Sequence, residues 1–182
     1  MSTSRIAGLS CLLIGVVLSA ATVAAQARTD ADEALEQLAW AIGGKWIAEI
    51  KGPDDKPLTV EATFEWAGHR KAIKYAVAFK SGDKSATNYE GVYYWHPKKK
   101  QLAMLQIDRQ GNVNESLLTR EGDHFKQRNS VTMADGTKRE QRAEFIREGD
   151  DAFAFKAFVP KGDDWVEAVA LKYKRVRDSK KP

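Results

Sequence analysis

The nine residues Leu58-Thr59-Val60-Glu61-Ala62-Thr63-Phe64-Glu65-Trp66 decide the fold class of this sequence. Apolar and polar side chains alternate along the whole stretch. Such a period of two places the apolar residues on one face of an extended strand and the polar residues on the other. A strand of this kind covers a core with one side and meets water with the other, as is typical of antiparallel sheets.

Extended segments of this type recur from residue 45 to residue 176, and short runs rich in Gly, Asp, Asn and Pro divide them. These residue types accept the backbone dihedrals of tight turns. Nine such turns predict ten strands, over 45–51, 58–66, 72–80, 88–95, 101–108, 113–120, 124–131, 137–147, 152–159 and 165–176. Connections this short join sequential strands as antiparallel hairpins.

Ten sequential hairpin-connected strands can close into a barrel or fold into a two-sheet sandwich. Closure leaves no sheet edge exposed, so we expect an all-β fold, a roughly ten-stranded antiparallel up-and-down β-barrel. An outer-membrane barrel would need an apolar outer face. The polar faces here carry charged residues instead: Glu61, Glu65, Lys138, Glu140, Arg142 and Glu144. A water-soluble barrel with a charged outside and an apolar inside is therefore expected.

One helix is predicted ahead of the strands, over residues 30–42. Leu35, Leu38 and Ile42 fall at helical spacing on one face. Asp30 with Glu33 three residues later forms a capping box, and the glycines that follow Ile42 end the helix. We expect the apolar face to pack on the barrel as a lid or plug.

The first 27 residues have the three parts of a secretory signal peptide. Arg5 precedes a short apolar run that ends at Val23, and Ala25 and Ala27 form the A-x-A pattern of a cleavage site. We expect cleavage after Ala27, no membrane span in the mature chain, and a periplasmic or secreted protein. The mature chain, 28–182, is then a single domain with its barrel at 45–176 and a loose tail at 178–182.

Composition excludes several function classes. The net charge of +4 is modest, and basic residues are interleaved with acidic ones, which predicts a solvated surface and no nucleic-acid partner. Cys11 is the only cysteine and lies in the signal, so the mature chain has neither a disulfide nor thiol chemistry. The oligomeric state stays open.

Motifs for catalysis or metal binding are absent from the sequence. It has no G-x-S-x-G, no Gly-rich phosphate loop and no histidine cluster with zinc spacing. Glu90, Asp108 and Glu115 lie on or near central strands and could meet inside a barrel. Because an acid/base pair needs a known separation and environment, we assign no catalytic residue and no metal ligand.

Aromatic residues on the predicted inward faces indicate a ligand pocket. Larger barrels leave room for a ligand, whereas small ones fill with side chains. We predict a pocket that is largely apolar with a few polar groups, although a packed core remains the alternative. The predicted ligand-binding residues are Trp66, Tyr75, Tyr93, Trp95, Gln106, Arg139, Gln141 and Phe155.

Gly44-Lys45-Trp46, at the start of the first strand and after a short helix, resembles the G-x-W start of lipocalin-like proteins. The chain looks most like the nitrobindin and fatty-acid-binding-protein end of that group, and like uncharacterised bacterial secreted proteins with similar domains. In lipocalins this tryptophan seals one end of the barrel beneath a basic side chain from near the end of the last strand. The resemblance implies these structural roles for Trp46 and Arg175.

Nitrobindin-like proteins hold haem through a histidine late in the chain. The histidines here are His69, His96 and His124, and none lies in the last strands. Haem iron needs an axial ligand, so we expect no haem and no other cofactor.

Together these features predict an exported carrier or sensor that binds a small hydrophobic or amphipathic ligand. Two alternatives stay open at this point. One is an isomerase or hydrolase that acts on a hydrophobic substrate in the same cavity. The other is a structural or interaction protein of the envelope with a filled barrel.

Overall fold

The computed structural model describes residues 30–52 and 55–177. The predicted signal peptide and the predicted tail lie outside these residues. A short helical segment precedes ten strands. The strands are β1 (Lys45–Lys51), β2 (Pro57–Ala67), β3 (Ala72–Ser81), β4 (Lys84–His96), β5 (Gln101–Asp108), β6 (Val113–Glu121), β7 (His124–Thr132), β8 (Lys138–Arg147), β9 (Ala152–Lys161) and β10 (Asp164–Val176).

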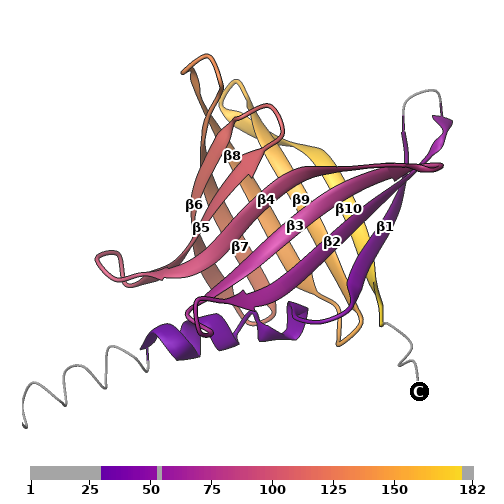
Figure 1. Cartoon of the computed structure of the whole chain (residues 1–182). Coiled ribbons are helices and arrows are strands. Elements are labelled where there is room, and N and C mark those ends of the chain that lie inside the picture. Colours follow the sequence, from indigo (N-terminus) through magenta and orange to yellow (C-terminus); the bar gives the residue numbers. More distant parts are fainter. Residues whose placement is uncertain (1–29, 53–54, 178–182) are drawn as a thin grey trace, which may run out of the picture.

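The strands form the predicted closed antiparallel barrel. Each strand pairs with its neighbours in sequence, and β1 also pairs with β10 to complete the circle (Figure 1). In that closing ladder Trp46 lies opposite Arg175, and Lys45 lies opposite Val176. The all-β, up-and-down prediction is therefore confirmed, and the sandwich alternative is wrong.

The helical segment crosses one end of the barrel, which we call the plug end (Figure 1). Residues 30–36 are α-helical, and Ala39–Ala41 form the 3₁₀ turn η1. The single helix predicted over 30–42 is interrupted, because the amides of Leu38 and Ala41 bond three residues back rather than four. The packing follows the prediction: Leu35 and Leu38 are buried, and Ile42 packs on the core.

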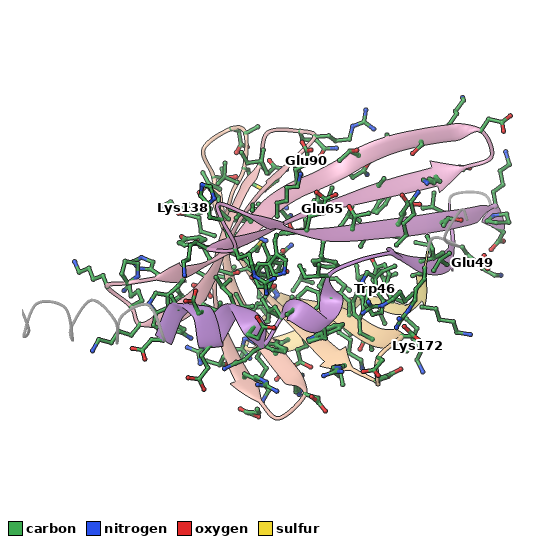
Figure 2. All side chains as sticks on the ribbon, turned by 60° about the horizontal axis from the view of Figure 1, so that its bottom comes forward. Trp46, Glu49, Glu65, Glu90, Lys138 and Lys172 are labelled. Atoms are coloured by element: carbon green, nitrogen blue, oxygen red, sulfur yellow. The ribbon has the colours of Figure 1, made fainter. Side chains whose placement is uncertain are left out.

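Strand β2 follows the predicted alternation at its centre, and burial is weaker toward its ends. Val60, Ala62 and Phe64 are buried, Leu58 and Trp66 are half-buried, and Glu65 is exposed. Glu61 was expected to be exposed, but its side chain is only 14% accessible because lysines from β1 and β3 cover it. Figure 2 shows other charged side chains, among them Glu65, Glu90 and Lys172, on the outside of the barrel.

The densest part of the core lies under the plug. Trp46 is fully buried, with its ring centroid 4.9 Å from that of Phe153 and 5.6 Å from that of Trp40. The indole Nε1 donates a hydrogen bond to the carbonyl oxygen of Ala41 at 2.8 Å, which ties η1 to β1. Such a contact satisfies the one polar atom of a buried tryptophan.

Gly44 allows the barrel to close beside the plug. Its φ is +72°, and a Cβ there would stand 2.8 Å from the carbonyl oxygen of Val176 on the neighbouring strand. Glycine meets both demands because it adopts positive φ freely and leaves room for a close backbone approach. Within the described part of the chain, no helix is long and apolar enough to cross a membrane.

Candidate ligand-binding cavity

A cavity of about 250 Å³ lies inside the barrel, above the core that contacts the plug. Side chains from β2 to β10 line it, and it extends toward the barrel end opposite the plug, which we call the open end. None of its lining residues is Asp, Glu, Lys, Arg or His. The cavity walls therefore carry no formal charge.

One side of the cavity is polar. Five amide side chains line it and come from four neighbouring strands, and we call them the amide wall. They are Gln106, Asn114, Gln127, Asn129 and Gln141. Strand register explains the clustering, because Gln106 is the direct partner of Asn114, and Asn129 is the direct partner of Gln141. Directly opposed residues on one face of an antiparallel ladder bring their side chains together.

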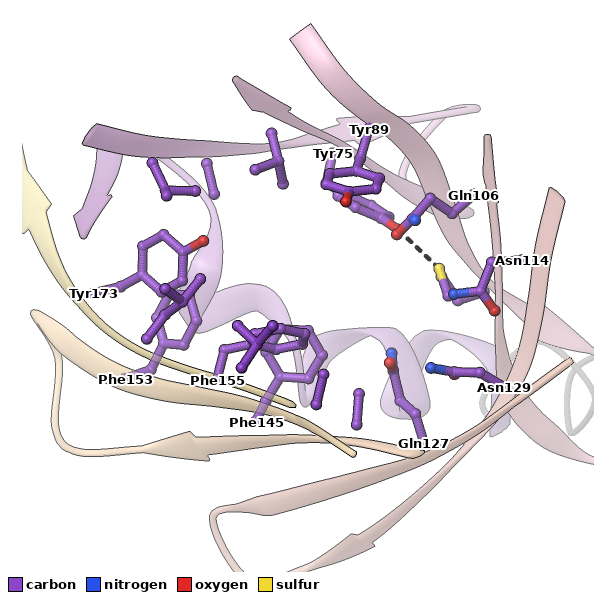
Figure 3. A pocket seen from close by; sticks show the side chains of 18 of the residues that line it. Tyr75, Tyr89, Gln106, Asn114, Gln127, Asn129, Phe145, Phe153, Phe155 and Tyr173 are labelled. Carbon is purple, nitrogen blue, oxygen red and sulfur yellow. Dashed lines mark hydrogen bonds between the residues drawn. The ribbon is translucent and has the colours of Figure 1, made fainter. Parts of the chain in front are cut away.

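The other side of the cavity is apolar. Phe145 on β8 and Phe155 on β9 lie beside the amide wall, with ring centroids 5.1 Å apart, and Phe153 stacks on Tyr173 at 4.6 Å (Figure 3). The remaining apolar lining residues are Val60, Ala62, Phe64, Val77, Phe79, Met104, Ala143, Ala157, Val169 and Leu171. The cavity is thus amphipathic across its width.

Four tyrosines, Tyr75, Tyr89, Tyr93 and Tyr173, complete the lining. Burial raises the pKa of Tyr75 well above its usual range, with a further contribution from Tyr93, and burial likewise raises the pKa of Tyr93 and Tyr173. Burial and then the charge of Asp108 raise the pKa of Tyr89. These phenols stay neutral at physiological pH. The Tyr75 hydroxyl, for example, donates a hydrogen bond to Gln106 Oε1 at 2.5 Å.

Five of the eight predicted ligand-binding residues meet in this cavity. They are Tyr75, Tyr93, Gln106, Gln141 and Phe155. Trp66 and Trp95 face inward too, but they lie near the plug end and pack against the closed core. Arg139 shares the inward side of β8 with Gln141, yet it lies next to the turn after β7 and is exposed. Alternation gives the face of a residue but not its height along the barrel.

Three members of the amide wall were missed: Asn114, Gln127 and Asn129. A usable signal exists in β7, where Gln127 and Asn129 have the same parity as the inward residue Phe125. In β6 the signal is ambiguous, because Leu117 and Leu118 are adjacent and either one could define the inward face. The structure buries Leu118, and this places Asn114 inside.

The carboxylates that were expected to meet inside the barrel do not do so. Glu90 and Glu115 are exposed on outer faces. Asp108 lies at the turn after β5, where it accepts hydrogen bonds from the amides of Gln110 and Asn112 at 2.9 and 3.0 Å. Glu90 and Glu115 have outward parity, whereas Asp108 has the inward parity of Gln106 and lies opposite Tyr89 at the end of β5, outside the cavity lining. The described lining therefore offers no carboxylate or imidazole for acid/base catalysis.

The histidines also lie away from the cavity. His69 occupies the turn after β2, His96 ends β4, and His124 faces outward on β7 with Nε2 3.1 Å from Glu144 Oε2. The lining residues thus do not fit a haem held through a histidine. Among the residues that the structure describes, no group of three or more His, Cys, Asp or Glu side chains could hold a metal ion.

The fold and the cavity define a class: a closed, ten-stranded antiparallel barrel with a plugged end and an internal amphipathic cavity. No family model matches the sequence, and no curated protein matches it. Among solved structures, the chain is similar to Rv2717c from M. tuberculosis, with a TM-score of 0.56 and 16% sequence identity over 79% of this chain and 98% of that chain. At this identity the likeness concerns the barrel fold alone.

Proposed function

We propose that this protein is a lipocalin-like carrier or sensor that binds a small hydrophobic or amphipathic molecule inside the barrel. The observation that carries the proposal is the cavity of about 250 Å³ between aromatic side chains and an amide wall. Ligand sites are concave and mostly apolar, with a few polar groups that fix orientation. A filled barrel, the structural alternative, does not agree with this cavity.

The proposal includes export. Its basis is the sequence of the first 27 residues, with Arg5, the apolar run and the A-x-A pattern that ends at Ala27. Mass spectrometry of the protein from its own host tests this part. We expect the mature chain to begin at Arg28 and to fractionate outside the cytoplasm. An intact chain that starts at Met1 in the cytoplasm would contradict export without affecting the cavity.

Ligand binding is tested most directly by native mass spectrometry of protein purified from its own host. We expect a bound species that Ala157→Trp removes, because Ala157 lines the cavity and an indole there would fill it. Ala170→Trp is the matched control, since Ala170 is exposed on the outer face of β10 and should leave binding intact. A chain that is always empty, and that takes up no added lipid or other small apolar molecule, would contradict the proposal.

A further inference from the structure

The two asparagines of the amide wall are buried without complete hydrogen bonding. Asn114 is 8% exposed and Asn129 is 7% exposed, and both line the cavity. The Oδ1 atom of each has no hydrogen-bond partner among the residues that the structure describes. Nearly all buried polar side-chain atoms in proteins are paired, and an unpaired one costs free energy. These two amides therefore do not contribute to the stability of the barrel through their oxygens.

The neighbouring polar groups do not satisfy the asparagines. Gln106 lies directly opposite Asn114, but its amide nitrogen does not donate to Asn114 Oδ1, and its oxygen accepts the hydrogen bond of Tyr75. Ser116 lies directly opposite Asn129, and its hydroxyl is also buried without a partner in the described chain. The unpaired groups therefore lie on adjoining strands, β6 and β7, and the two amides point into the same space (Figure 3).

The charge of the cavity restricts what these amides can bind. A carboxylate or ammonium group inside it would lose its water and find no opposite charge on the walls. A neutral amide, in contrast, both donates and accepts hydrogen bonds. The matching partner is an uncharged group that can do the same, such as a carboxamide or a hydroxyl.

The apolar side of the cavity indicates the shape of the rest of the molecule. Phe145 and Phe155 present aromatic surface to the same cavity, on the strands next to the one that carries Asn129. A buried apolar cavity of about 150 Å³ accommodates benzene. The volume of about 250 Å³ found here therefore suits a body of two fused rings or a branched chain of similar size.

We infer that the cavity selects an uncharged amphipathic molecule, whose donor–acceptor end bonds Asn114 and Asn129 and whose aromatic or aliphatic body lies against Phe145 and Phe155. This inference rests on the proposed ligand-binding function and specifies the chemical class of its ligand. It separates the site from one built for fatty-acid carboxylates, which would need a buried cation.

Three probes of similar size test the inference: naphthalene, 2-naphthamide and 2-naphthoate. Their affinities for the full mature chain are measured at pH 7 by the fluorescence of the naphthalene ring. We expect 2-naphthamide to bind about tenfold more tightly than naphthalene, since two neutral hydrogen bonds are worth roughly this factor. We expect 2-naphthoate, which has nearly the same shape but is charged, to bind most weakly.

The double variant Asn114→Leu/Asn129→Leu gives the decisive comparison. Leucine has a similar size and no polar atom, so naphthalene should bind as well or better while the preference for 2-naphthamide disappears. Thr119→Leu, a polar-to-leucine change at an exposed position of β6, should preserve the preference. Circular dichroism and thermal unfolding establish that each variant is folded.

Different results would overturn different statements. If 2-naphthoate binds as tightly as 2-naphthamide, or if the amide preference survives in the double variant, the inferred ligand class is wrong while cavity binding stands. If none of the three probes binds to the wild-type chain, the proposed cavity function itself is wrong, and the inference with it.

Discussion

The guanidinium carbon of Arg175 lies 4.3 Å from the centroid of the Trp46 ring, and the two residues are direct partners in the ladder that closes the barrel. This distance is within the reach of about 6 Å that a cation–π contact has. The same guanidinium donates hydrogen bonds to the carbonyl oxygens of Trp40, Ile42 and Gly43. Arg175 therefore joins the last strand, the first strand and the plug.

We predict that Arg175→Met destabilises the protein by about 1–3 kcal/mol, because the plug carbonyls lose their donors and the indole loses its cation. Urea unfolding followed by tryptophan fluorescence measures this change. Arg175 Nε also lies 3.4 Å from Asp151 Oδ1. Arg177→Met is the control, since Arg177 is exposed and pairs with the same carboxylate. Equal effects of the two substitutions would show that Arg175 acts only through Asp151.

Replacing Trp46 itself should cost more. The ring is fully buried against Trp40 and Phe153, so Trp46→Ala is expected to destabilise the fold by about 3–5 kcal/mol. Thermal unfolding is the measurement, and Trp46→Phe should recover part of the loss by restoring ring contacts. Trp165→Ala serves as the comparison, because Trp165 is only half-buried beneath Arg142. A loss below 1 kcal/mol for Trp46→Ala would refute the sealing role.

The plug shows what periodicity can and cannot predict. Leu35 and Leu38 were placed correctly because both lie on one apolar face over a single helical turn. The break after residue 36 was not predicted. It depends on tertiary contacts, since η1 brings the carbonyl of Ala41 to the Trp46 indole and that of Trp40 to Arg175. The residues of the helix itself do not indicate that it will contact Trp46 and Arg175.

The cavity shows the same limit for the strands. Alternation placed Tyr75, Gln106 and Phe155 on the inner face, and their parity alone suffices for that. The height of a residue in the barrel depends on strand tilt and register, which no turn motif specifies, so Trp66 and Arg139 were assigned to a pocket they do not reach. Asn129 has the inward parity of Phe125, so the same alternation that placed Gln106 inside would have placed Asn129 there too.

Gly91 leaves the space that the cavity-lining Tyr75 ring occupies. A Cβ at this position would stand 2.6 Å from Tyr75 Cε1 and 2.6 Å from the carbonyl oxygen of Leu105. We predict that Gly91→Ala costs about 1–3 kcal/mol through overpacking and displaces the Tyr75 ring. Thermal unfolding gives the stability, and near-ultraviolet circular dichroism reports the tyrosine. A variant with wild-type stability and a wild-type tyrosine signal would show that the neighbouring strands accommodate the added methyl group without strain.

Glu61 links stability to pH through two neighbouring lysines. Its Oε2 lies 2.6 Å from Lys80 Nζ, and its Oε1 lies 3.5 Å from Lys45 Nζ. Burial alone would raise the pKa of Glu61, but the hydrogen bonds and charges of Lys80 and Lys45 outweigh it and hold the pKa below the ordinary 4.5. The ion pairs thus favour the ionised carboxylate in the folded state.

We predict that Glu61→Gln lowers the free energy of unfolding by about 1–2 kcal/mol at pH 7, since hydrogen bonds to charged groups are worth roughly this much. Because the folded-state pKa is depressed, the wild-type advantage is complete above pH 4.5 and is lost as the pH falls through the lower folded-state value. Urea unfolding of both proteins between pH 7 and pH 3 checks this, and the two curves should converge on the acid side. Glu65→Gln is the control, because it breaks an exposed pair with Lys74, and it should lower the free energy of unfolding at pH 7 by less than Glu61→Gln does. A gap between wild type and Glu61→Gln that stays constant down to pH 3 would show that the side chain acts by packing and not by charge.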